Sequence, residues 1–346
     1  MKTLRLPAEW EPQRGIMLTW PHANTDWCDC LQDAIACFLA IAREVVKRES
    51  LLIVTPEVDV VKSQLVEADI SMENIRFFEC PTNDTWARDH GFISLFDEQG
   101  TPIVADFCFN GWGMKFAADK DNQINAKLMQ TDLLGDVCYS DNRDVVLEGG
   151  SIESDGKGTL LTTSECLLAP NRNNFASVAE AEQMFRTRLG VERVLWLDNG
   201  YLAGDDTDSH IDTLARLCPN DTIVYVQCTD KADEHYDSLV RMEQQLKQLK
   251  TAEGKPYRLL PLPMTDAVYF EGERLPATYA NFLIINGAVL MPTYAQAEND
   301  ARAMAVLAEA FPDREVVGID CRVLIRQHGS LHCVTMQFPK RNNFKK

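Results

Sequence analysis

Reactive side chains recur at regular intervals along the chain, each in a short polar segment beside an apolar run. Asp89, Glu148 and Asp206 are separated by 59 and 58 residues. His210 follows Asp206 closely, and Cys333 lies in the last such segment, near the end of the sequence. This repeated placement predicts that the five side chains occupy equivalent positions in repeated structural units.

These residue types suit chemistry on a guanidinium group, which is a planar cation with a fork of N–H donors. Carboxylates such as Asp89, Glu148 and Asp206 bind that fork through paired, charge-assisted hydrogen bonds. A cysteine thiolate is a nucleophile for the central carbon, and a histidine can transfer the protons. Cys333 and His210 are therefore the candidate nucleophile and general acid/base.

Two tryptophans are candidates for covering the cation, and each reactive residue also has an ordinary structural explanation. Trp86 or Trp20 could stack on a planar cation, a contact worth about 0.5–2 kcal/mol, although core packing explains either one equally well. Asp206 could be a turn residue, and Glu148 could belong to a bend beside two glycines. His210 could be a core histidine whose hydrogen bonds are all made within the protein. A single cysteine in an apolar strand is most often inert packing. The equivalent positions favour a shared site over these separate roles.

The elements that must position these residues follow one repeated order: a β-hairpin, an amphipathic helix and a short apolar strand. The clearest copy covers residues 281–319, where Asn286-Gly287 between two apolar runs predicts a tight turn. A helix is predicted over 296–311 and a strand over 316–319. The side chains expected on the inner face of that helix are Met304, Leu307, Ala308 and Phe311.

Three earlier copies and one split copy complete the pattern. The earlier hairpins are predicted over 92–107, 150–168 and 210–228, with helices over 122–134, 177–189 and 236–249. The split copy has a strand over 16–20, a helix over 31–46 and a strand over 51–54, and its missing strand is expected in 331–338.

That last strand would close the chain on itself and remove the edges of the sheets. Five such units describe a propeller-like α/β ring, in which equivalent positions converge on the axis. The alternative is an ordinary α/β protein with chance regularity.

Composition and charge narrow the class of partner. The chain has 346 residues and a formal net charge of -18, which disfavours nucleic acid and anionic membranes and favours small cations, although an acidic surface also serves solubility. Eleven cysteines without framework spacing, and an N-terminus without a signal-peptide pattern, predict reduced thiols in a cytoplasm. We expect one domain over 1–346, and the sequence leaves a homo-oligomer open.

The sequence predicts neither a metal site nor a cofactor. Cys28 and Cys30 are closer together than the usual zinc-binding pair, and no second pair follows. His332 and Cys333 are adjacent, so they would point to opposite faces of a strand. No phosphate-binding loop or dinucleotide fingerprint is present in the sequence.

Taken in order, the motifs of the chain closely resemble the agmatine deiminase family, also called the Porphyromonas-type peptidylarginine deiminase family. The resemblance covers nearly the whole chain and implies the pentein fold of the guanidine-modifying superfamily, a five-fold α/β propeller. The motifs are PAEWEP at 7–12, LTWP at 18–21, NDTWARD at 83–89, FNGWG at 109–113, LEGGSI at 147–152, PNRN at 170–173, DTDSH at 206–210 and HCVT at 332–335.

The resemblance also implies roles and a reaction. Cys333 would be the nucleophile and His210 the general acid/base, while Glu148 would pair with His210 and help hold the guanidinium. Asp89 and Asp206 would hold its nitrogens. Attack by the thiolate would release ammonia and leave a covalent thiouronium, which water would hydrolyse without a cofactor. With agmatine the product would be N-carbamoylputrescine, a step toward putrescine.

Departures from the family pattern leave the substrate open. Asp208-Ser209 replaces the usual Asn-Gly or Asn-Glu pair, Phe92 stands where proline is common, and 327–331 lacks the glycine-rich run and asparagine found in many members. Deimination of arginine in peptides or proteins is the closest alternative to agmatine. Transfer of the amidino group to an amine and an inactive ring that binds a cationic amine are the others.

Overall fold

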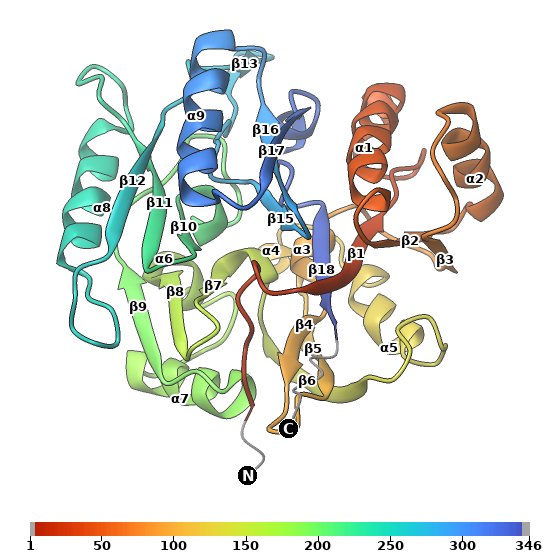
Figure 1. The fold of residues 1–346 in the computed structure, drawn as a ribbon, viewed down its shortest axis with the longest axis horizontal. Helices are drawn as coiled ribbons and strands as arrows, with labels where there is room; N and C mark the ends of the chain where they lie inside the picture. Colours follow the sequence, from red (N-terminus) through yellow and green to blue (C-terminus); the bar gives the residue numbers. More distant parts are fainter. Residues whose placement is uncertain (1–3, 341–346) are drawn as a thin grey trace.

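The computed structural model describes residues 4–340, which form a mixed α/β fold (Figure 1). Within these residues, five sheets share one construction, in which an antiparallel pair of strands is extended by a parallel third strand. Four of these sheets are β4 (Ile93–Phe96), β5 (Pro102–Cys108) and β6 (Cys138–Val146); β7 (Ile152–Ser154), β8 (Thr159–Thr163) and β9 (Arg193–Leu197); β10 (Ala215–Cys218), β11 (Thr222–Gln227) and β12 (Arg258–Pro263); and β15 (Leu283–Ile285), β16 (Ala288–Thr293) and β17 (Glu315–Asp320).

The fifth sheet joins the two ends of the chain, as the split copy predicts. Its strands lie in the order β18 (Thr335–Pro339), β1 (Gln13–Thr19), β2 (Ser50–Thr55) and β3 (Ile75–Glu79). β18 is antiparallel to β1, with Met17 opposite Met336, and Figure 1 shows the two strands side by side. The predicted pairing of the last strand with the first is thus confirmed, although β18 begins at Thr335 rather than at Leu331.

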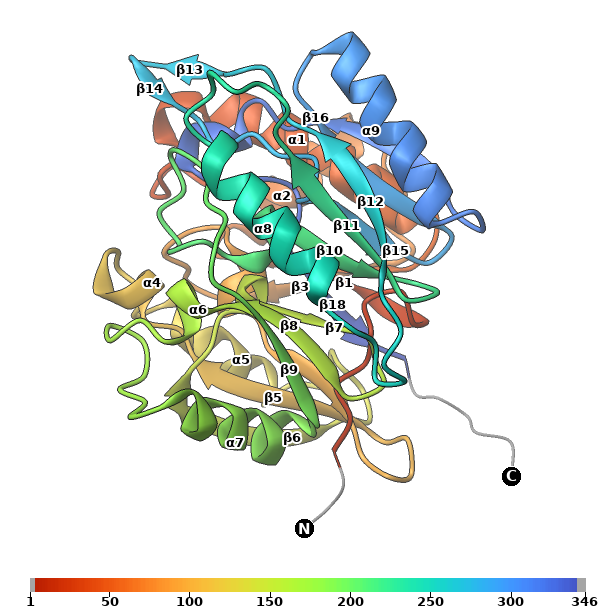
Figure 2. The same cartoon turned by 90° about the vertical axis from the view of Figure 1, so that its left-hand side faces the viewer.

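The longer helices lie on the outside of the fold and the strands lie further in (Figures 1 and 2). They are α1 (Leu31–Val46), α7 (Val178–Leu189), α8 (Tyr236–Gln248) and α9 (Ala297–Ala310). Each buries one apolar stripe, as in α8, where Leu239, Met242 and Leu246 are buried at helical spacing. Elements that the sequence did not predict are α2 (Val58–Glu67), strand β3, and a small hairpin of β13 (Tyr269–Phe270) and β14 (Glu273–Arg274).

The copy over 281–319 has the predicted elements. The Asn286-Gly287 turn joins β15 to β16, and Gly287 has φ 76°, a conformation that favours glycine. In α9 Leu307 is buried, as is Phe311 just beyond its end, but Ala308 is exposed, so its predicted inward position is wrong. Ala303 and Ala310 complete the buried side of this helix.

Helix α7 begins and ends at the predicted signals. The Ser177 side chain accepts a hydrogen bond from the backbone N–H of Glu180, while the Glu180 carboxylate accepts one from the N–H of Ala176. This resembles a capping box, except that the Glu180 side chain bonds the N–H of Ala176, the residue before the N-cap, instead of the N–H of Ser177 itself. Gly190 ends the helix with φ 71°, which L side chains rarely adopt.

The helix predicted over 122–134 is much shorter in the structure. Only Ile124–Leu128 forms an α-helix, α5. The Thr131 hydroxyl donates to the carbonyl of Leu128 and accepts from the N–H of Leu133. These two backbone groups would bond to other backbone groups if the helix continued, so the side chain competes with the helix. Among the residues that the structure describes, no helix is long and apolar enough to cross a membrane.

Candidate active site

Four segments from distant parts of the chain bring the predicted residues together. Asp89 lies on the short helix α3 (Ala87–His90), and Cys333 lies two residues before β18. Glu148 and His210 each directly precede a 3₁₀ helix. The exposed fractions of Asp89, Glu148, His210 and Cys333 are 3, 0, 1 and 6%, so all four are buried.

A cavity of about 260 Å³ opens onto this group. Asp89 and Cys333 form part of its wall, as do Asp206 and Trp86. His210 lies behind the wall against Asp89, and Glu148 lies against His210. A molecule in the cavity would therefore meet the thiol and one carboxylate directly.

The His210 imidazole lies between two carboxylates. Its Nε2 is 3.4 Å from Oε2 of Glu148, and its Nδ1 is 3.7 Å from Oδ1 of Asp89. Burial disfavours the charged ring, but Asp89, Cys166 and Glu148 together outweigh burial, and the pKa of His210 lies well above its usual value. The surroundings of His210 therefore favour the imidazolium, the form that can give a proton to a leaving group.

Asp89 is held by one donor on each oxygen. The backbone N–H of Gly150 donates to Oδ1 at 3.0 Å, and the indole Nε1–H of Trp112 donates to Oδ2 at 2.9 Å. Burial raises the pKa of Asp89 to about 6, although His210 opposes that rise. The carboxylate is ionised at neutral pH and keeps further lone pairs for a cationic ligand.

The surroundings of Cys333 favour its thiol form over the thiolate. Burial and the negative charges of Asp212 and Asp89 raise its pKa well above the usual value. Its Sγ lies 3.4 Å from Oδ1 of Asn281, a carbonyl oxygen that accepts from S–H but repels a thiolate. A bound cation beside Asp89 would offset these effects and favour ionisation.

Asp212 is a site residue that the sequence analysis missed. A Cβ added to Gly150 would lie 2.6 Å from Nδ1 of His210, 2.9 Å from Oδ1 of Asp89 and 3.1 Å from Oδ2 of Asp212, so these atoms converge on one glycine. Asp212 is fully buried, and its Oδ1 has no hydrogen-bond partner among the residues that the structure describes. Its position two residues after His210 was the available signal.

Asp206, the carboxylate that the spacing favoured, lies further out. Its side chain is half-buried on the cavity wall, and its backbone carbonyl accepts from Nζ of Lys115 at 2.6 Å. Burial raises the pKa of Asp206, with His328 opposing the rise. The structure thus brings Asp206 to the cavity wall, whereas Asp212 lies with Asp89 and His210 around Gly150.

The two tryptophans differ. Trp86 lines the cavity, donates its indole N–H to Oδ2 of Asp84 at 2.9 Å and packs against Gly329. Trp20 does not line it, and its predicted contact with substrate is wrong: the ring is 1% exposed, meets Phe38 edge-on, and donates to Gln64. Trp20 follows β1, which has β18 on one edge and β2 on the other and is buried at every residue except Arg14.

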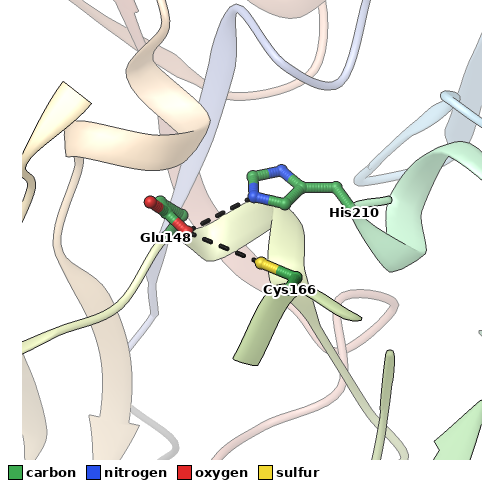
Figure 3. A group of neighbouring side chains, drawn as sticks. All are labelled: Glu148, Cys166 and His210. Carbon is green, nitrogen blue, oxygen red and sulfur yellow. Dashed lines mark hydrogen bonds and ion pairs between the residues drawn. The ribbon is translucent and has the colours of Figure 1, made fainter. Parts of the chain in front are cut away.

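A second buried thiol, Cys166, touches the site (Figure 3). Its Sγ lies 3.8 Å from Oε2 of Glu148, and ligand atoms of Glu148, Cys166 and His210 all lie within 4.8 Å of one another. These donor types could hold a zinc ion. However, Nε of Arg172 lies 3.0 Å from Oε1 of Glu148, so a guanidinium already balances that carboxylate.

Arg172 gives Glu148 a fixed role. Burial raises the pKa of Glu148, but His210 and Arg172 lower it below the usual value, so Glu148 stays ionised. The charges alternate from Arg172 to Glu148 to His210, and this order favours the protonated imidazole. The whole arrangement combines a nucleophilic thiol, a proton donor and carboxylates for a cation, which are the parts of a cysteine-dependent enzyme that acts on a cationic substrate.

Comparison with known proteins agrees with this class. Residues 5–339 match the family described as Porphyromonas-type peptidyl-arginine deiminase. The agmatine deiminase of Pseudomonas aeruginosa (strain LESB58) is 32% identical over 358 residues, covering 97% of this chain and 95% of that protein. The chain belongs to the Porphyromonas-type peptidyl-arginine deiminase family.

Solved structures share the fold over nearly the full length. A cysteine-to-serine variant of the C. jejuni agmatine deiminase with substrate bound has a TM-score of 0.89 and 37% identity, over 98% of this chain and 97% of that one. A Porphyromonas gingivalis protein provisionally assigned as an arginine deiminase has a TM-score of 0.92 and 53% identity, over 97% and 98% of the two chains.

Proposed function

We propose that this chain is a cofactor-free hydrolase that removes ammonia from agmatine to give N-carbamoylputrescine, a step toward putrescine. The observation that carries the proposal is the convergence of the Cys333 thiol and the Asp89 carboxylate on one cavity, with His210 directly behind Asp89. Membership of the deiminase family, and relatives named agmatine deiminase, support this choice of substrate.

The first half of the proposed reaction uses the guanidinium charge. Asp89 and Asp212 hold the planar cation, and Asp206 contacts the substrate from the cavity wall. The cation lowers the pKa of the Cys333 thiol, whose proton leaves to solvent. The thiolate forms a C–S bond to the guanidinium carbon, and the C–N bond breaks as the His210 imidazolium protonates the departing ammonia. A cationic thiouronium remains on Cys333.

The second half replaces sulfur by oxygen. The neutral His210 imidazole takes a proton from water as the water oxygen attacks the thiouronium carbon. The adduct then collapses: its C–S bond breaks, the hydroxyl proton returns to the sulfur, and the ureido product leaves. Glu148, held by Arg172, stabilises the imidazolium formed in this step. The two halves balance: each cycle consumes one water, releases one ammonia and one ureido product, and restores the enzyme.

We also propose that residues 1–346 form a single domain with the five-bladed pentein propeller fold. The propeller would bring the site residues together at its axis. The common construction of the five sheets and the pairing of β18 with β1 support this arrangement. Each of Glu148 and His210 precedes a 3₁₀ helix and a hairpin, as equivalent positions in two blades would. Eleven free cysteines support a reducing, cytoplasmic setting.

Deimination of arginine, free or in a peptide, is the second candidate. The family description and the provisional assignment of the P. gingivalis protein favour it. Against it, a cavity of about 260 Å³ walled by several carboxylates suits a small substrate without a carboxylate of its own.

The test is incubation with agmatine, free arginine and a blocked arginine peptide, with ammonia and ureido product both measured. Turnover of agmatine alone supports the proposal. Turnover of the peptide at a higher kcat/KM than agmatine would replace it with the second candidate. Binding of agmatine without any ammonia would instead identify a protein that sequesters cationic amines.

A further inference from the structure

Beside the site, residues Gly111–Met114 form a single turn of left-handed helix, α4. Their φ angles are 67°, 53°, 83° and 66°. The N–H of Met114 donates to the carbonyl of Asn110, and the N–H of Lys115 to that of Gly111, the spacing of a helical turn. Left-handed helical conformation costs an L-residue about 1–2 kcal/mol, and it is rare for consecutive residues.

The surrounding chain holds this turn in place. The Asn110 side chain accepts from the N–H of Gly113 at 2.8 Å and donates to the carbonyl of Asn171 at 3.0 Å. A Cβ at Gly113 would lie 2.1 Å from Nδ2 of Asn171, so only glycine allows this packing. The turn is therefore fixed on the same segment that carries Arg172.

The turn delivers one side chain to the reaction centre. Trp112 is buried in the cavity wall, and its ring meets Phe109 and Phe116 of the same wall edge-on, at centroid distances of 5.0 and 5.5 Å. Its Nε1–H reaches Oδ2 of Asp89 at 2.9 Å. Strain held next to a reactive group indicates a functional demand on the position of that side chain.

The bond from Trp112 completes the fixing of Asp89. The N–H of Gly150 holds Oδ1, and the indole N–H holds Oδ2, so both oxygens are restrained and the plane of the carboxylate is set. Each oxygen keeps a second acceptor site, which is what a two-pronged guanidinium contact needs.

We propose that Trp112 is a positioning residue: the left-handed turn brings its indole N–H to Asp89 and thereby aims the carboxylate at the guanidinium of the substrate. The kinetic part of this inference rests on the proposed function, but the orientation of Asp89 does not. Trp112 acts through Asp89 and also keeps that carboxylate ionised, in a setting where Asp212 and Glu148 oppose its charge and His210 supports it.

The test variant is Trp112→Phe, which keeps an aromatic ring and removes the N–H donor. Loss of a hydrogen bond to a charged group predicts a fall in kcat/KM of about 10- to 100-fold, mostly through a higher KM. The acid limb of the pH profile of kcat/KM should move to higher pH, because Asp89 loses a donor that stabilises its anion. A purely structural role would leave that limb in place.

Trp196→Phe is the matched control. The Trp196 indole also donates to a carboxylate, Glu182, at 3.0 Å, but it lies on β9 away from the cavity. This variant should keep the wild-type pH profile. If W112F melts far below wild type, β-(3-benzothienyl)alanine at position 112 keeps the ring shape and has sulfur in place of the N–H, so the same measurements apply.

Crystal structures of the variants separate this inference from the proposed function. Rotation or splitting of the Asp89 carboxylate in the Trp112 variant supports the inference whatever the substrate. An unchanged carboxylate, or an unchanged acid limb in an active enzyme, overturns it. Absence of agmatine turnover by wild type would overturn the proposed function and leave the structural test in force.

Discussion

The Cys333 thiol and the Asn281 amide are in direct contact, with Sγ 3.4 Å from Oδ1. The same oxygen accepts from the backbone N–H of His332 at 2.9 Å. That bond fixes the orientation of the amide, because a flipped amide would set its NH₂ group against another donor. The atom facing the sulfur is therefore an acceptor, which stabilises the thiol rather than the thiolate.

Asn281→Ala should make the empty-site thiol more reactive while weakening catalysis. Removing the acceptor lowers the pKa of Cys333, although burial, Asp212 and Asp89 still hold it above the usual value. Alkylation by iodoacetamide near pH 8 should become faster, and kcat/KM should fall because the sulfur is less well placed. Cys333→Ser identifies labelling of other cysteines. Unchanged or slower alkylation of Cys333 would contradict the role given to Asn281.

The acid limb of kcat/KM should report Asp89. Its pKa is raised to about 6, so the carboxylate that binds the cation is lost as pH falls through that value, and kcat/KM falls with it. Asp89→Asn should lower kcat/KM by at least about 100-fold. The activity that remains should no longer fall across this range of pH. A D89N enzyme that keeps the wild-type acid limb would assign the limb to another group.

Asp212→Asn should harm catalysis far more than Asp206→Asn. Asp212 is fully buried beside Asp89 and the thiol, whereas Asp206 is half-buried on the cavity wall. We expect a loss in kcat/KM of about 100-fold or more for D212N and about 10-fold or less for D206N. A larger loss of kcat/KM for D206N than for D212N would instead support Asp206 as the main carboxylate, as the spacing predicts. Circular dichroism of both variants checks that the comparison concerns folded enzyme.

Gly150→Ala should disable the site and, because it overpacks buried groups, lower the free energy of unfolding by about 1–3 kcal/mol. The added Cβ would press on His210, Asp89 and Asp212, and a displacement of about 1 Å can cost about 100-fold in rate. Gly254→Ala is the contrasting variant, since Gly254 has φ 80° and an added Cβ would meet no described atom within 4 Å. It should lower the melting temperature slightly and keep full activity. An active G150A enzyme would show that the three groups need not stay where they are.

Met114→Gly should stabilise the protein. Met114 is 78% exposed and has φ 66°, so glycine removes strain and almost no packing, a gain of up to about 1 kcal/mol in the free energy of unfolding. Val60→Gly, in the ordinary helix α2, should destabilise it by about 0.5 kcal/mol. Urea denaturation measures both. A destabilised M114G would mean that the left-handed turn carries no strain at this residue.

Local signals in the sequence predicted most of the elements but not the directions of individual side chains. Asn286-Gly287 and Gly190 act over a few residues, so the hairpin and the helix end followed from them. The spacing favours Asp206 because it matches the repeat, and it gives no reason to single out Asp212. The 3₁₀ turn after His210 turns Asp212 inward, and that turn has no signature in a spacing of 58 or 59 residues.

The remaining misses also depend on tertiary contacts. The sequence gives no reason to prefer Trp20 or Trp86 as the residue that covers the cation. The structure distinguishes them, because Phe38 packs against Trp20 while Trp86 lines the cavity. Cys166 reaches Glu148 from a four-residue helix that has no special sequence pattern. The left-handed turn at Trp112 requires the bonds from Asn110 and the close approach of Asn171, which no local propensity encodes.

In the proposed reaction, Cys333 becomes covalently bound to the substrate carbon. Mass spectrometry of enzyme quenched in acid during turnover of agmatine tests it directly. We predict an adduct with the mass of agmatine less one ammonia, located on the peptide that contains Cys333 and absent from the C333S variant. An enzyme that turns over agmatine and carries this adduct on Cys166, or on no cysteine under any quench time, would contradict the account.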